Sequence, residues 1–176
     1  LSVGDVITLG LPTSPTVNTR NRWAWDIEEF DNIVASSWLD QTSSNAASSI
    51  NPTTGTSPST TQSNELVFAA FGYGSRTFTP STGSLFTVSP QQKTTAGSSD
   101  RSLSNEWKFV TATGTQVATG KFSAPASAAA YVGLLATYKT TGALSAVTGT
   151  LSLADGAGFA GTFVAPLLSD NRTYLL

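Results

Sequence analysis

Short runs of apolar residues, separated by clusters of Gly, Pro, Ser, Thr and Asn, recur along the whole chain. This pattern predicts an all-β protein, because such clusters form turns between short strands. Gly4–Leu11 is a first expected strand, and it stops at Pro12 because proline has no N–H to donate to a sheet. Glu65–Gly74 and Ala128–Tyr138 are nearly continuous apolar runs, which indicates two strands that are buried on both faces.

The region around the first two tryptophans has two interpretations. In Arg20–Phe30, Trp23, Trp25 and Ile27 alternate with charged or small residues, which predicts a strand with one apolar and one charged face. Apolar residues within Ala24–Val34 also recur roughly at helical spacing, so a helix is the alternative.

Further strands are expected in the second half of the chain. Asn105–Ala112 and Gln116–Phe122 flank the sequence TGT at 113–115, which predicts a β-hairpin. Shorter strands are expected at Phe78 and at Leu85–Val88.

Together these segments give enough strands by Lys139 for an antiparallel two-sheet β-sandwich with a jelly-roll-like arrangement. We therefore assign residues 1–139 to one β-sandwich domain, within which Gln41–Ser63 is expected to be a polar extended loop. Residues 140–176 are rich in Gly and Ala. They are expected to be a light β extension for assembly, because small side chains have little to pack against in isolation.

The composition narrows the classes of partner. Charged residues make up 11% of the chain, the net charge is -2, and Ser and Thr account for 51 of the 176 residues. Hydroxyl groups must therefore keep the surface soluble, which is typical of a protein outside cells or one that packs against its own copies. The nine basic residues are scattered, which argues against nucleic acid. No apolar run approaches the length of about 18 residues that a membrane helix needs.

The chain has no His and no Cys. Ser-His-Asp and Cys-His catalytic arrangements and ordinary zinc sites are therefore excluded, and no cofactor or metal is expected. Met is also absent, and the chain opens on Leu1 without the basic and apolar regions of a signal peptide. We expect that a preceding segment was removed or lies outside this sequence.

The sequence QSNELVFAAFG (62–72), followed by TFTP (77–80), is similar to a β-sandwich domain that recurs in phage structural proteins and in large bacterial cell-surface proteins. The later pieces of that domain resemble Asn105–Val110, the Gly114 hairpin and Ala128–Lys139, and its preceding segment resembles Gly4–Leu9 and Trp23–Phe30. The resemblance covers roughly residues 4–139, and its motifs are strands and turns. It implies an extracellular or virion role without enzymatic activity.

Four acidic residues form the densest cluster of candidate functional groups: Asp26, Glu28, Glu29 and Asp31. Their carboxylates could bind Ca²⁺ or act as an acid–base pair. The favoured interpretation is a solvated strand face balanced by Arg20 and Arg22, since no glycine-punctuated Asp-x-Asp loop accompanies the cluster.

Other candidates also have structural explanations. Six aromatic residues could form a sugar-stacking platform, although core packing is favoured for them: Trp23, Trp25, Trp38, Tyr73, Trp107 and Tyr131. The sequence GYGSR (72–76) is more typical of a strand end than of a phosphate loop, because no Gly-Lys-Thr follows. A glycosylation sequon stands at 171–173.

The sequence thus favours a non-enzymatic virion structural protein, a capsid decoration or tail component on the virion surface or outside the cell. Its expected partners are copies of itself and other virion structural proteins, with host surface glycans as a further candidate. One alternative is an extracellular carbohydrate-binding or adhesive module. A glycosidase that uses Asp26 and Glu28 is the other.

Overall fold

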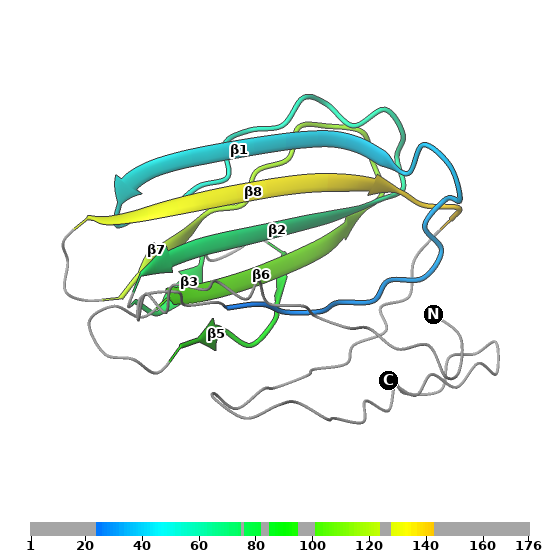
Figure 1. Ribbon diagram of the computed structural model, residues 1–176. Coiled ribbons are helices and arrows are strands. Elements are labelled where there is room, and N and C mark those ends of the chain that lie inside the picture. Colours follow the sequence, from blue (N-terminus) through cyan, green and yellow to red (C-terminus); the bar gives the residue numbers. More distant parts are fainter. Residues whose placement is uncertain (1–23, 75, 82–84, 95–100, 124–127, 143–176) are drawn as a thin grey trace, which may run out of the picture.

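The computed structural model describes residues 24–74, 76–81, 85–94, 101–123 and 128–142. Every regular element in these residues is a strand, and every strand pair is antiparallel (Figure 1). The prediction of an all-β protein is therefore confirmed. The expected first strand Gly4–Leu11 and residues 143–176 of the expected extension lie outside the described residues.

The strands form a six-stranded sheet and a two-stranded sheet. The larger sheet has, in spatial order, β1 (Leu39–Ser49), β8 (Ala129–Lys139), β2 (Glu65–Gly74), β6 (Arg101–Val110) and β4 (Thr87–Val88), and β5 (Gln92–Lys93) also pairs with β6. The smaller sheet consists of β3 (Phe78–Pro80) and β7 (Gly120–Phe122).

The two apolar runs form strands as predicted. Strand β2 has the predicted bounds, lies between β6 and β8, and has few exposed positions. Strand β8 differs, because its residues alternate: Tyr131, Gly133 and Leu135 are buried, whereas Val132 and Leu134 are exposed. The prediction that β8 is buried on both faces is therefore wrong. It lies next to the edge strand β1, and only one of its faces is covered by the described residues.

The hydrophobic core lies between the larger sheet and the β3–β7 pair. Phe78 of β3 stacks on Phe71 of β2 with ring centroids 4.7 Å apart. Phe122 of β7 lies 4.7 Å from Tyr73 and 6.1 Å from Tyr131, again between ring centroids. We call the face of the larger sheet that bears these residues the core face.

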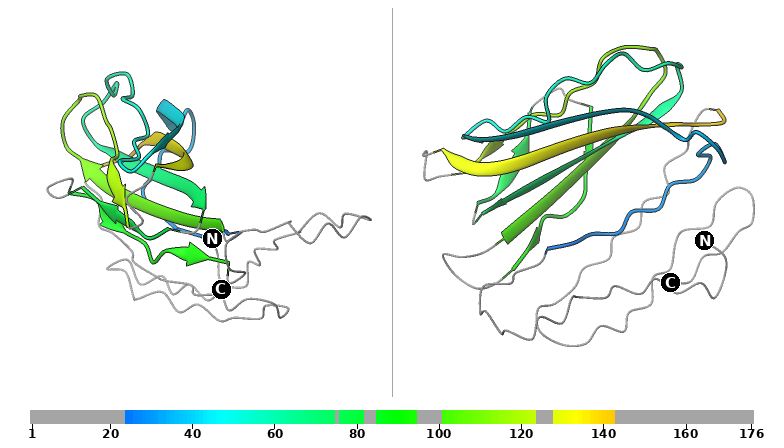
Figure 2. Two further views of the ribbon diagram at one scale, coloured as in Figure 1. Left: turned by 90° about the vertical axis from the view of Figure 1, so that its left-hand side faces the viewer. Right: turned by 45° about the horizontal axis from the view of Figure 1, so that its top comes forward.

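Residues 41–63 do not form the expected polar loop. Their first part belongs to β1, which pairs along its length with β8. The next part, 50–60, runs beside 114–122: the Phe122 N–H donates to the Ile50 carbonyl (2.9 Å) and the Gly120 N–H donates to the Pro52 carbonyl (3.0 Å). Figure 2 shows these two segments side by side. The small side chains of β1 are sufficient for its pairing with β8, because an edge strand buries few side chains.

The predicted hairpin around Gly114 is also wrong. Strand β6 pairs with β2, β4 and β5, whereas 116–122 pairs with 50–60 and with β3. The chain therefore leaves the larger sheet after Val110. It continues in a group of segments that we call the second layer, which consists of 50–60, 114–122 and β3, and there alternate residues of 116–122 are buried again.

Residues 24–34 form neither the predicted strand nor the alternative helix, and Ile33 makes only an isolated bridge to Thr140. The segment packs on the outer face of the larger sheet, the face opposite the core. There Phe30 contacts Phe68 and Trp107, with centroid distances of 6.2 and 5.5 Å. The alternation of apolar and polar side chains reflects this half-buried packing without backbone pairing.

Candidate functional site

The outer face of the larger sheet has a covered half and an open half. Residues 24–31 cover β2 and β6, whereas β8 and β1 carry no such cover among the described residues. On β8, Val132 is 48% exposed and Leu134 is 53% exposed. Their partners on β1 are Ala46 and Ser44. We name this half the open face, and it comprises Thr42, Ser44, Ala46, Ser48, Ala130, Val132 and Leu134.

The open face ends at a long edge strand. Strand β1 has 11 residues, and within the described chain it pairs only with β8. Asp40 is its one charged residue. Beside it, Trp38 is 48% exposed and stacks on Tyr138 with ring centroids 5.7 Å apart. Edge strands are usually protected by lysine, proline or a covering segment, and β1 itself contains neither lysine nor proline.

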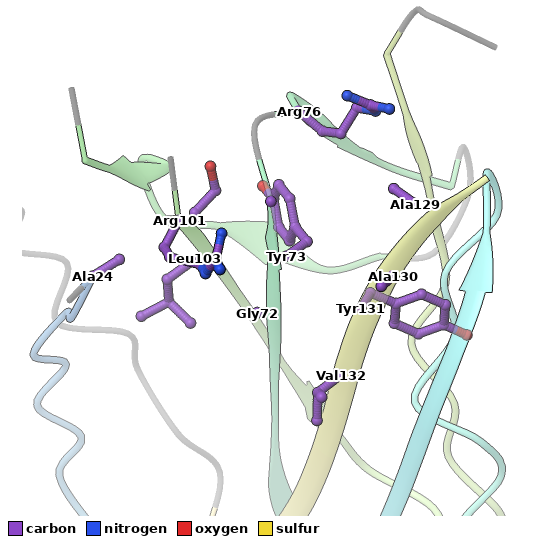
Figure 3. A pocket seen from close by; sticks show the side chains of 12 residues that line it. Ala24, Gly72, Tyr73, Arg76, Arg101, Leu103, Ala129, Ala130, Tyr131 and Val132 are labelled. Carbon is purple, nitrogen blue, oxygen red and sulfur yellow. The ribbon is translucent and has the colours of Figure 1, made fainter. Parts of the chain in front are cut away.

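An open, shallow pocket of about 650 Å³ lies on the same outer face near the ends of β2, β6 and β8. Figure 3 shows Leu103 and Val132 on either side of Gly72, whose missing side chain leaves the hollow. Residues 72–74 are part of β2 and pair with β6, so they form a strand end rather than a phosphate loop. Ser75 lies outside the described residues.

The acidic cluster is not a solvated strand face. Asp26 accepts hydrogen bonds from the Ile27 N–H (3.0 Å) and the Asn105 side chain (3.2 Å), and Glu28 accepts one from the Ser89 hydroxyl. Burial raises the pKa of both Asp26 and Glu28. The expectation of a solvated face is therefore wrong for this pair, which is half-buried against the sheet.

Among the described residues the acidic cluster does not come together as a metal site. Asp31 caps its own turn by accepting the Asn32 N–H (2.6 Å). Arg20 and Arg22, the expected balancing charges, lie outside the described residues. Across the ranges that the structure describes, no group of three or more His, Cys, Asp or Glu could hold a metal ion.

Two buried glutamates were missed in the sequence. Glu106 on β6 is 0% exposed, and no described donor reaches either of its carboxyl oxygens. Burial raises its pKa to about 7, although the charge of Lys108 lowers it in part. Side chains alternate along β6, so Glu106 projects from the face opposite to Trp107, and the sequence pattern would predict a solvent-exposed side chain there. In the structure both faces of β6 are covered. Side-chain alternation alone does not reveal that second cover.

The second buried glutamate, Glu65, belongs to a charged group at one end of the core face. Asp40 Oδ1 lies 3.3 Å from Lys139 Nζ. The Thr61 N–H donates to Asp40 Oδ2 (2.7 Å), and the Thr61 hydroxyl donates to Oδ1 (2.6 Å). Although burial raises the pKa of Asp40, these hydrogen bonds, together with Glu65 and Lys139, lower it to about 2. For Glu65, burial raises the pKa, the Thr137 hydroxyl lowers it in part, and the Asp40 carboxylate raises it further.

The six aromatic residues do not gather into one platform. Tyr73, Trp107 and Tyr131 are buried, as core packing predicts, and Trp25 is half-buried. Trp38 is exposed. Trp23 and the sequon at 171–173 lie outside the described residues.

In the part of the chain that the structure describes, no helix is long and apolar enough to cross a membrane. Comparison with known proteins finds no matching family model, no similar curated protein and no similar solved structure.

Proposed function

We propose that this chain is a non-enzymatic structural protein of a virion surface, a capsid decoration or tail component that acts by subunit assembly. In this proposal the two sheets belong to a β-sandwich with a jelly-roll-like arrangement. The protein works on the virion or outside the cell, and its partners are copies of itself and other virion structural proteins.

The open face beside the edge strand β1 carries this proposal. Val132 and Leu134 expose about half of their side chains on a regular sheet surface, where β-branched and aliphatic residues are normally covered. Covering such side chains contributes roughly 25 cal/mol per Å² of apolar surface before the costs of association are subtracted.

The edge of β1 supports the same interpretation. Two copies can align their β1 strands antiparallel about a two-fold axis and so continue the sheet through backbone hydrogen bonds. This contact needs no charged side chain, which agrees with a chain that is only 11% charged. Ser and Thr side chains of β1 then lie at the contact, where they can exchange hydrogen bonds.

Residues 41–60 and 140–141 belong to the folded body of the protein. Residues 41–60 pack within their own chain, so they do not form a free arm. Thr140 and Thr141 also belong to the folded body, because the Thr140 hydroxyl donates to the Asn64 carbonyl (2.9 Å) and the Thr141 N–H donates to the Asn32 carbonyl (2.8 Å). The proposed assembly extension is thereby reduced to 143–176.

One observation favours the carbohydrate-binding or adhesive alternative. Trp38, which is 48% exposed, stacks on the half-buried Tyr138, and exposed aromatic side chains can pack against sugar rings. The two functions are separated by measuring the purified chain by sedimentation velocity over a range of concentrations, and by probing a glycan array with the same sample. Concentration-dependent oligomers without glycan binding support assembly. A persistent monomer that binds glycans, and loses this binding in Trp38→Ala, overturns it.

A further inference from the structure

Glu106 lies on the core face of β6, directly beside the short edge strand β4. Its Cα atom pairs with Val88 of β4 on one side and with Ala69 of β2 on the other. Strand β4 consists of Thr87 and Val88 alone, and both residues pair with β6. Because Glu106 is 0% exposed, a fully buried carboxyl group lies next to a strand that pairs with the sheet at only two positions.

The surroundings of this carboxyl group favour its neutral form. No described donor reaches either of its oxygens, and both cross-strand partners are apolar. Lys108, two residues further along β6, favours the charged form in part, but the Lys108 ammonium lies over the Phe86 ring, 4.6 Å from the ring centroid. Glu28, which accepts the Ser89 hydroxyl beside β4, is a second acid and offers no positive charge.

The other elements around Glu106 place no further charge next to it within the described chain. Strands β3 and β4 and residues 50–60 contain no charged side chain. The charged residues of β2, β5 and β7 lie elsewhere, since Glu65 is four residues from Ala69, and Lys93 and Lys121 are exposed. Burial therefore dominates and raises the pKa of Glu106 to about 7.

Residues 85–89, which we call the β4 segment, are held to the sheet by few backbone contacts. Besides the two pairs of β4, the Ser89 N–H donates to the Asn105 carbonyl (3.0 Å). The segment begins at Leu85, whose φ of 59° is uncommon for a residue other than glycine and whose side chain is 88% exposed. Segments with few buried contacts open locally at a lower free energy than core strands.

We propose that the β4 segment is a pH-sensitive element that detaches from β6 when Glu106 loses its proton. The carboxylate meets no described donor in the closed arrangement, whereas water solvates it once β4 moves away. Opening exposes the backbone N–H and C=O groups of β6 that β4 covers, and a freed strand edge can pair with another extended segment. This inference concerns the chain itself and does not depend on the proposed function.

The two pKa values of Glu106 determine the direction of the effect. In the closed arrangement the pKa is about 7, and in the open arrangement it returns toward the ordinary value of 4.5. At pH values below 4.5 the carboxyl group is protonated in both arrangements, so pH has little effect there. As pH rises from there to the closed-arrangement value, the open arrangement releases its proton first, and opening becomes more favourable by up to about 300-fold. At higher pH the gain levels off.

Hydrogen–deuterium exchange of the purified full chain, followed by mass spectrometry over a series of pH values, tests the inference. Division by the intrinsic exchange rate at each pH leaves only the opening equilibrium. We expect the protection of peptides that cover 85–89 to fall by up to about 300-fold across this range. It should depend little on sub-denaturing urea, because a local opening exposes little surface. Protection that does not change with pH would overturn the inference. A urea dependence as steep as that of β8 would also overturn it, because the segment would then open only with the whole fold.

Two variants assign the effect to one carboxyl group. Glu106→Gln keeps the shape of the side chain but cannot ionise, and it is expected to make the protection of 85–89 independent of pH. Glu28→Gln changes the half-buried acid that contacts Ser89, and it is expected to retain the pH dependence. A pH dependence that survives in Glu106→Gln, or that disappears in Glu28→Gln, would show that Glu106 is not the trigger.

Discussion

Thr54 and Ala118 exchange two hydrogen bonds between the segments that form the second layer. The Thr54 N–H donates to the Ala118 carbonyl, and the Ala118 N–H donates to the Thr54 hydroxyl oxygen, both at 3.0 Å. The same exchange joins Ser57 to Gln116 and Thr60 to Gly114, with distances from 2.8 to 3.2 Å. The hydroxyl oxygens of every third residue on one segment (54, 57 and 60) therefore accept hydrogen bonds from the backbone N–H groups of every second residue on the other segment (118, 116 and 114). In a regular β-ladder the acceptor would be a backbone carbonyl oxygen.

This ladder predicts a specific effect of removing one hydroxyl. Thr54 is 0% exposed, and Thr54→Val keeps its shape but leaves the buried Ala118 N–H without an acceptor. We expect the free energy of unfolding to fall by about 1–3 kcal/mol, measured by urea denaturation. Thr54→Ser retains the acceptor and should lose less. Thr56→Val, at an exposed position of the same segment, should be nearly neutral, and equal losses at 54 and 56 would contradict the ladder.

The close approach of the two layers at Gly133 gives a second prediction. A Cβ atom there would lie 2.8 Å from the Thr53 carbonyl oxygen and 3.0 Å from the Phe71 ring. Gly133→Ala should therefore lower the free energy of unfolding by about 1–3 kcal/mol, because the backbone of the second layer must shift. Gly72→Ala on the neighbouring strand meets nothing within 4 Å and is the matched control. A stability loss in Gly72→Ala as large as in Gly133→Ala would show that strand glycines matter here for another reason.

Glu106 predicts a dependence of stability on pH. Its pKa is raised from 4.5 to about 7, so the folded chain holds a proton that the unfolded chain releases between these values. The free energy of unfolding should fall as pH rises through this window, by about 3 kcal/mol, and level off above it. Thermal denaturation at a series of pH values measures this slope. Glu106→Gln should flatten most of it, with a residual slope from Asp26, Glu28 and Glu65, whose pKa values are also raised. An unchanged slope in Glu106→Gln would assign the effect to other groups.

Trp107 and Trp38 provide a comparison of a buried with an exposed tryptophan. Trp107 is 6% exposed and contacts Phe30 and Phe109 with centroid distances of 5.5 and 5.4 Å. Trp107→Ala should cost about 3–5 kcal/mol in chemical denaturation and release residues 24–31 from the outer face. Trp38→Ala, at a position that is 48% exposed, should cost much less. Similar losses in both variants would mean that residues 24–31 are not held by Trp107.

The sequence predicted correctly the strands whose hydrophobic pattern alone indicates their burial and their bounds. Strand β2 is a central strand covered on both faces, so its apolar run indicated its bounds correctly. Strand β1 was missed because an edge strand of Ser, Ala and Asn is defined by backbone pairing with β8, which no local pattern contains. The segment 24–34 was assigned wrongly for the opposite reason, since its side chains alternate against a sheet while its backbone remains unpaired.

The residues of the candidate site were likewise predicted where the local side-chain pattern is sufficient and missed where strand pairing brings them together. The burial of Trp107, Tyr73 and Tyr131 was predicted, because aromatic residues in strands are usually covered. The group of Asp40, Glu65 and Lys139 was missed, since it depends on strand order and on a bulge that the residues alone do not reveal.

Assembly through the open face is the central claim, and sedimentation velocity of a paired set of variants tests it most directly. Val132→Asp combined with Leu134→Asp places charge on the open face, whereas Val117→Asp places charge on an exposed residue of the second layer, which is 40% exposed. We predict that the wild type and Val117→Asp form the same concentration-dependent oligomers, and that the double variant stays folded and monomeric. Oligomers that persist unchanged in the folded double variant would contradict the claim.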